Sequence, residues 1–137
     1  MSSPIVDQPP PVPTGRRPSW EIVISYVQST AGPARILDLV LADMRERDQV
    51  GRQRYGTPLT SGNGRDHLVD ALQEQLDSAV YLATALDEHG VGPDTQIDES
   101  LIPDSDLRYR LFCVQDLFAD QVRSLIKLRA LIEERAP

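Results

Sequence analysis

The chain has 137 residues, which favours a single domain that can bury a modest core. Its formal net charge is −7 and its pI is about 4.7. An acidic surface repels nucleic-acid backbones and anionic membranes, so we expect no genomic nucleic-acid partner. No apolar run approaches the roughly 18 residues of a membrane-spanning helix, and the N-terminus lacks the apolar core of a signal peptide. We therefore expect a cytoplasmic protein with no membrane partner.

The composition also favours packed helices. Aromatic residues make up only 5% of the chain, so the core must consist mostly of Leu, Val, Ile and Ala. Cys113 is the single cysteine. This excludes an intramolecular disulfide and a cysteine-based zinc site within one chain.

Residues 1–18 are dominated by proline. They hold six of the eleven prolines of the chain, and proline is incompatible with the interior of a regular helix or of a central strand. We therefore expect residues 1–18 to form a disordered or polyproline-II tail, and residues 19–137 to form a single helical domain. A PxxP ligand for another domain is the alternative for this tail.

Residues 20–28 fit either a strand or a helix. Ile22, Val23, Ile24 and Val27 are β-branched and favour a strand. Ser19, however, can cap a helix. We favour the helix, because no other segment offers a convincing strand to pair with.

Two helices separated by a glycine-rich loop are expected next. From Pro33 to about Arg54, apolar residues recur at helical spacing. Residues 55–65 contain three glycines, a proline and an Asn-Gly pair, which are typical of a loop. Asp66 is a good N-cap for a helix that runs to about His89 and ends at a glycine.

A last helix of about 30 residues is expected near the C-terminus, and Asp104, Ser105 or Asp106 can cap it. Its apolar positions step by three and four, so it needs a partner within the bundle or across a dimer. These positions are Leu107, Leu111, Val114, Phe118, Val122, Leu125, Leu128 and Ile132. The whole pattern predicts an all-α bundle of about four helices, in which the helices that begin near 33 and 66 pack antiparallel.

Two carboxylate pairs occur on these two helices: Asp43 with Glu46, and Glu74 with Asp77. Residues three apart lie on one helix face, so each pair can direct two carboxylates to one point. Two adjacent helices could pool the four groups around a hard divalent cation, an arrangement suited to metal-assisted phosphate chemistry. Asp48 competes with Glu46 for the second position on the first helix.

The acidic residues of the second helix belong to a longer stripe. Asp70, Glu74, Asp77 and Tyr81 step by four, three and four, so they share one face. Residues 66–107 contain no Lys or Arg, and clustered carboxylates repel one another unless a cation lies between them. The stripe therefore indicates a metal site, and an ordinary solvated helix face is the alternative.

The array Asp43-x-x-Glu46 and Glu74-x-x-Asp77 resembles the ExxE…ExxD signature of the all-α nucleoside triphosphate pyrophosphohydrolases, the MazG-like and dimeric dUTPase superfamily. The loop and the following helix start also resemble short MazG-like proteins of phages and bacteria, which share a Tyr-Gly-x-x-Leu loop and a Gly-Arg-Asp helix start. The resemblance covers about residues 34–88.

The resemblance implies a Mg²⁺-dependent enzyme that hydrolyses a nucleoside triphosphate to the monophosphate and pyrophosphate. The four carboxylates would bind Mg²⁺, and Glu46 and Glu74 would also be the catalytic residues that activate water. The candidate substrate-binding residues are Arg52, Arg54, Tyr55, Arg65, Asp70 and Tyr81. A homodimer or higher homo-oligomer is implied as well.

The chain departs from the family pattern at two positions. Asp43 stands where the family usually has glutamate, and Gln73 precedes Glu74 where the family often has two glutamates. Two other functions therefore stay open: a scaffold that binds nucleotide without hydrolysing it, and a protein-interaction module. Release of pyrophosphate from nucleotides with Mg²⁺ distinguishes the enzyme from both.

Overall fold

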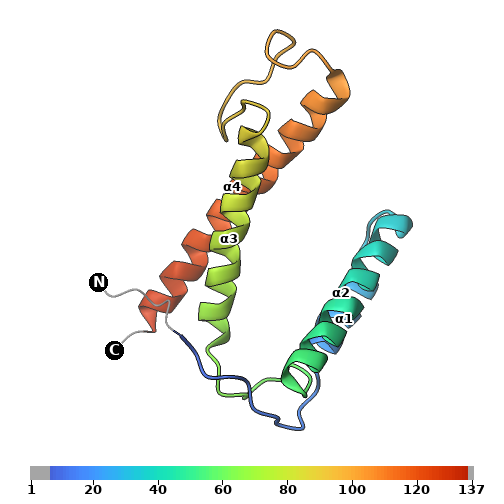
Figure 1. Ribbon diagram of the computed structural model, residues 1–137, viewed down its shortest axis with the longest axis vertical. Helices are drawn as coiled ribbons and strands as arrows, with labels where there is room; N and C mark the ends of the chain where they lie inside the picture. The colour runs from blue at the N-terminus through green and yellow to red at the C-terminus, as the bar shows by residue number, and fades with distance from the viewer. Residues whose placement is uncertain (1–6, 136–137) are drawn as a thin grey trace. The chain divides into compact units, whose positions relative to one another are not determined.

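The computed structural model describes residues 7–135, and within them all regular structure is helical, apart from one isolated β-bridge. The helices are α1 (Ser19–Gln28), α2 (Ala34–Tyr55), α3 (His67–Asp87) and α4 (Ser105–Glu134) (Figure 1). The predicted all-α fold with a long C-terminal helix is therefore confirmed. None of these four helices has a stretch that is both long and apolar enough to cross a membrane.

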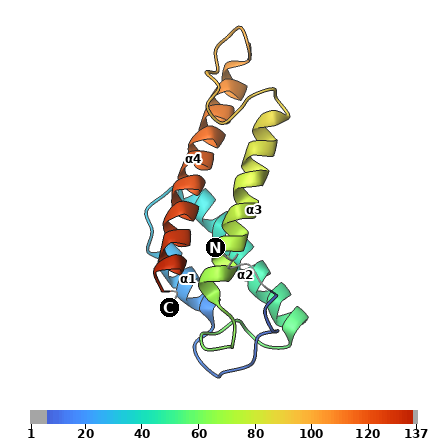
Figure 2. The same ribbon diagram turned by 90° about the vertical axis from the view of Figure 1, so that its left-hand side faces the viewer.

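The described chain divides into two compact units, where the sequence predicts a single helical domain. The N-terminal unit is Asp7–Arg65, and the C-terminal unit comprises the described residues from Asp66 onward. Each unit is built on one pair of neighbouring helices, α1 with α2 and α3 with α4 (Figures 1 and 2). The predicted packing of the helix near 33 on the helix near 66 would join the two units, and it stays a prediction.

The C-terminal unit is an antiparallel hairpin whose helices both begin at aspartate caps. Asp66 accepts a hydrogen bond from the Val69 N–H (3.3 Å), and Asp104 accepts one from the Leu107 N–H (3.0 Å). Each cap satisfies a backbone donor that has no partner inside its helix. Asp66 also forms an ion pair with Arg135, just beyond α4. The start of α3 is thereby tied to the end of α4.

Two apolar clusters hold α3 against α4. The first consists of Val69, Leu72, Leu128 and Ile132. The second consists of Leu86, Val91, Ile102 and Leu111, and includes the loop between the helices. Burying one such side chain stabilises the fold by about 1.5–3 kcal/mol. The apolar positions predicted on the last helix therefore pack against α3 within the same chain.

Side chains of α4 hold the loop that connects it to α3. Two of them donate hydrogen bonds to loop carbonyls, which would otherwise need water or other donors. The bonds run from Gln115 Nε2 to Gly92 O and Thr95 O, and from Arg108 Nη1 to Ile102 O and Pro103 O, each at 2.9 Å. The loop is consequently part of the folded unit.

The N-terminal unit has a different character, because neither α1 nor α2 contains a buried residue. Residues 20–28 are helical, so the choice of helix over strand is confirmed. Gly56 ends α2 at φ 71°, a left-handed conformation that glycine adopts without strain. Large apolar side chains of both helices are exposed: Ile22, Val23, Tyr26, Ile36, Leu39 and Val50.

Residues 7–18, part of the predicted disordered or polyproline-II tail, contact the rest of the N-terminal unit. The segment is hydrogen-bonded to the loop after α2, and a β-bridge pairs Pro18 with Thr60. The bonds run from Ser19 N–H to Leu59 O (2.7 Å), from Val12 N–H to Asn63 O (3.0 Å), from Thr14 Oγ1 to Thr60 Oγ1 (2.7 Å) and from Arg65 Nη1 to Pro9 O (2.9 Å). Residues 1–6, the rest of the predicted tail, lie outside the described residues.

Candidate functional site

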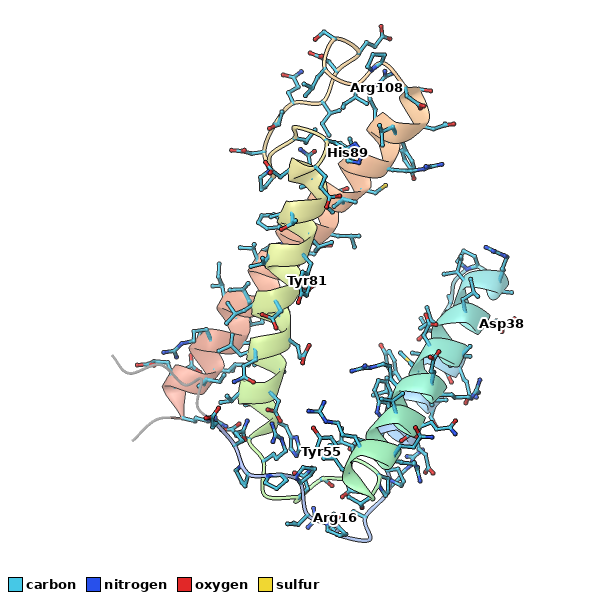
Figure 3. All side chains as sticks on the ribbon, in the orientation of Figure 1. Arg16, Asp38, Tyr55, Tyr81, His89 and Arg108 are labelled. Atoms are coloured by element: carbon cyan, nitrogen blue, oxygen red, sulfur yellow. The ribbon has the colours of Figure 1, made fainter. Side chains whose placement is uncertain are left out.

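The acidic stripe of α3 lies on the side of the helix opposite its buried residues. Glu74, Asp77 and Tyr81 are exposed and Asp70 is half-buried. Tyr81, which is 71% exposed, marks the stripe in Figure 3. Neither Glu74 nor Asp77 forms an ion pair with any residue between 7 and 135. No basic side chain in this range therefore offsets the charge of these two carboxylates.

The predicted carboxylates of α2 are exposed as well. Asp43 and Glu46 both belong to α2, and neither forms an ion pair within the described residues. Asp48 differs from them, because it is half-buried and pairs with Arg52 at 3.0 Å, one helical turn away. This ion pair favours Glu46 over Asp48 as the partner of Asp43.

The four predicted metal ligands are divided equally between the two units. Asp43 and Glu46 belong to the N-terminal unit, and Glu74 and Asp77 belong to the C-terminal unit. In the part of the chain that the structure describes, no three His, Cys, Asp or Glu side chains are grouped so that they could hold a metal ion. Joint use of the four carboxylates in one site thus stays a prediction.

The residues predicted to bind phosphate and base all lie in or next to the loop of the N-terminal unit, except Asp70 and Tyr81. Arg52 is held by its ion pair with Asp48. The Arg54 guanidinium lies over the ring of Tyr55, with 5.2 Å between its central carbon and the ring centroid. A cation over an aromatic face is attracted by the ring quadrupole.

This loop also contains two buried polar side chains that the sequence analysis does not name as site residues. Thr60 is 2% exposed and Asn63 is 1% exposed. Asn63 Oδ1 accepts a hydrogen bond from the Arg65 N–H (3.1 Å), whereas its Nδ2 has no acceptor among the described residues. A buried donor without a partner is unusual and calls for a physical explanation.

Charge is distributed unevenly between the two units. Asp7–Arg65 carries eight arginines and six carboxylates, a net charge of +2. Residues 66–137 carry six basic and fifteen acidic side chains, a net charge of −9. The excess negative charge of the protein therefore lies entirely in the C-terminal unit.

A shallow hollow lies beside the second half of α3, and its volume is about 420 Å³. Its walls are Val80, Ala83, Thr84, Asp87, Val91, Gly92 and Pro93. None of the predicted site residues lines it, and a single carboxylate provides its only charge. The hollow is thus separate from the stripe that the sequence singles out.

Comparison of the chain with protein-family models, with curated proteins and with solved structures finds no match.

Proposed function

We propose that this protein is a Mg²⁺-dependent nucleoside triphosphate pyrophosphohydrolase of the MazG-like kind, which releases a nucleoside monophosphate and pyrophosphate. The observation that carries the proposal is the carboxylate face of α3. Glu74 and Asp77 are exposed on it and have no ion-pair partner among residues 7–135. The resemblance of the sequence to that family supports the same reading of these two residues.

The carboxylate oxygens of the four predicted metal ligands are suitable ligands for Mg²⁺. This ion prefers oxygen ligands, and proteins commonly hold it with one or two carboxylates while substrate phosphates and waters complete the shell. Glu74 and Asp77 alone would satisfy that minimum, and Asp43 and Glu46 would supply the further ligands. When bound, Mg²⁺ neutralises charge on the triphosphate, which a face of carboxylates alone would repel.

The protein side chains have distinct roles in the proposed reaction. Either Glu74 or Glu46 accepts the one proton released by the water that attacks between the α- and β-phosphates, and pyrophosphate leaves. Arg54 and Arg65 offset the negative charge that develops on the phosphates. Tyr55 and Tyr81 provide exposed aromatic faces on which a base can stack.

The test is a screen of ribo- and deoxyribonucleoside triphosphates with Mg²⁺ in which pyrophosphate is measured. Glu74→Gln keeps the shape of the side chain and removes its charge, so we expect the rate to fall by about 10²-fold or more. Glu88→Gln is the matched control. It makes the same chemical change at an exposed residue fourteen positions after Glu74, outside the predicted site. Equal rates for wild type and Glu74→Gln, or no pyrophosphate from any nucleotide, would reject the proposal.

Exposed apolar side chains favour a second candidate function, that of a protein-interaction module. On α4 they are Phe112, Leu117, Ile126 and Leu131, between 49% and 61% exposed. Such exposed apolar side chains could also serve the homo-oligomer that the family resemblance implies. Light scattering of the purified chain distinguishes self-association from a monomer, and the pyrophosphate screen separates an enzyme from a module without activity.

A further inference from the structure

Residues 8–14 form an extended, proline-rich segment at the surface of the N-terminal unit. Four of the five residues from 9 to 13 are proline, and residues 7–15 form neither helix nor strand nor turn. Proline fixes its own φ at about −65° and restricts the residue before it to extended conformations, so this run favours a polyproline-II helix. Such a helix repeats every three residues and therefore has three faces.

The burial of the segment follows this period of three. Gln8, Pro11 and Thr14 are half-buried, whereas the residues between them are exposed: Pro9, Pro10, Val12 and Pro13. One face of the segment consequently lies on the rest of the N-terminal unit. The other two faces are open to solvent.

Hydrogen bonds to the loop after α2 hold the segment in place (Figure 1). Val12 is the only residue from 9 to 13 that has a backbone N–H, and this N–H already donates to Asn63 O (3.0 Å). Pro9 O accepts a hydrogen bond from Arg65 Nη1 (2.9 Å). A partner therefore meets a segment that is already ordered, which lowers the entropic cost of binding.

The open faces present two residue pairs of the same kind. Pro9-Pro10 and Val12-Pro13 each place an apolar residue before an exposed proline, and the half-buried Pro11 separates the two pairs. Aromatic-lined grooves of SH3-type domains bind Pro-x-x-Pro segments in the polyproline-II conformation. The period of three puts Pro10 and Pro13 on one open face. Both pairs can therefore enter one groove without displacing Pro11 from the loop.

The charge beside the segment favours a groove with an acidic rim. The N-terminal unit has a net charge of +2. Arg16, which follows the segment, is exposed and forms no ion pair with any residue between 7 and 135. Complementary charge at the edge of an interface promotes association and fixes the orientation of the partners.

We propose that residues 9–13 are a docking site for a protein domain of the SH3 type, whose aromatic groove takes the two exposed pairs and whose acidic rim faces Arg16. A second copy of this chain is a less suitable occupant, because aromatic residues make up only 5% of the sequence. The docking site does not depend on the proposed enzymatic function, and either can fail without the other.

The test is NMR titration of the full chain into a panel of purified, isotope-labelled SH3 domains that bind Pro-x-x-Pro peptides. We expect the resonances of the groove aromatic residues to shift. Pro10→Ala and Pro13→Ala should each weaken binding about tenfold, because each removes an apolar ring from the groove. Pro11→Ala is the matched control: it removes the same ring and the same backbone constraint on the inward face, and should change the affinity less than twofold. Arg16→Ala should weaken binding about threefold.

Three results would overturn the inference: no shift in the groove of any domain of the panel, unchanged affinity in both Pro10→Ala and Pro13→Ala, or an equal loss in Pro11→Ala and Pro10→Ala. Unchanged affinity in Arg16→Ala would refute the acidic rim. Light scattering addresses the other occupant. Self-association of the wild type that is lost in Pro10→Ala would assign the segment to a second copy of the chain and overturn the proposal.

Discussion

Asp66 performs two structural tasks, and substitutions can separate them. Its side chain caps α3 through the Val69 N–H, and it pairs with Arg135 at the other end of the helical hairpin. Asp66→Ala removes both interactions. Asp66→Asn keeps an oxygen that can accept the cap hydrogen bond and removes only the charge. Arg135→Ala removes only the ion pair.

The structure sets the expected magnitudes. Loss of an N-cap aspartate costs about 1 kcal/mol. The ion pair contributes about 0.5 kcal/mol, because its two side chains are 38% and 44% exposed and solvent screens their attraction. Asp66→Ala should therefore lower the stability of the C-terminal unit by about 1.5 kcal/mol, a decrease in Tm of roughly 6 °C. Asp66→Asn and Arg135→Ala should each lower it by about a third as much.

The pH dependence gives an independent check. The hydrogen bond from Arg135 is the main cause that holds the pKa of Asp66 below its usual value, with the backbone hydrogen bond at Val69 adding to it and burial opposing it. A lowered pKa in the folded state means that the stabilisation is complete above the pKa of the unfolded chain. It is lost as the pH falls through the folded-state pKa, so the gap between wild type and Asp66→Asn should shrink below about pH 4.

The assay is thermal unfolding followed by far-ultraviolet circular dichroism at pH 7 and pH 3, on wild type and the three variants. If Asp66→Asn is as destabilising as Asp66→Ala at pH 7, the cap hydrogen bond contributes nothing and the reasoning is refuted. A gap between wild type and Asp66→Asn that is as large at pH 3 as at pH 7 would refute the electrostatic part.

Two further predictions concern the core and the loop of the C-terminal unit. Leu86→Ala should destabilise it by about 2–5 kcal/mol in urea unfolding, because this side chain is 0% exposed; Val80→Ala, at a position 61% exposed, is the control and should cost less than about 0.5 kcal/mol. Gln115→Glu removes the donor to the carbonyls of Gly92 and Thr95 and places a charge beside them. The N–H groups of Gly92 and Thr95 bond to Thr95 Oγ1 (2.8 Å) and Gly92 O (3.3 Å) within this loop, so their hydrogen exchange should accelerate roughly tenfold when the loop loosens. Unchanged rates would show that Gln115 does not hold the loop.

Local signals predicted the helices well. The aspartates at 66 and 104 cap helices as expected, because a cap depends on a donor only three residues away. The regular hydrogen bonding of α3 ends at Asp87, and Gly90 follows as the predicted C′ glycine. There the Val91 N–H bonds to Leu86 O, and the chain turns at Gly90 with φ 69°. The Gly90 N–H also bonds to Asp87 O (2.9 Å), and this pair of bonds is typical of a glycine that ends a helix, as the sequence predicts.

Contacts between distant segments were not predictable in the same way. Prolines in residues 7–18 predict a disordered or polyproline-II tail, but they do not predict its contacts: proline carbonyls still accept hydrogen bonds, and Val12 and Ser19 still donate them. The carboxylates of the candidate site were found because spacing on a helix is a local property. Whether α2 and α3 share them depends on contacts between helices, which spacing does not determine.

The exposed leucines, isoleucines and valines of α1 and α2 have a thermodynamic consequence. A helix pair that leaves these side chains in water gains little from the hydrophobic effect, so its own melting should be shallow and depend on protein concentration or bound ligand. The protein is then not a two-state system. Trp20, its single tryptophan, lies in α1 and reports on that half of the molecule alone. Its emission should change at a lower temperature than the helical signal of α3 and α4.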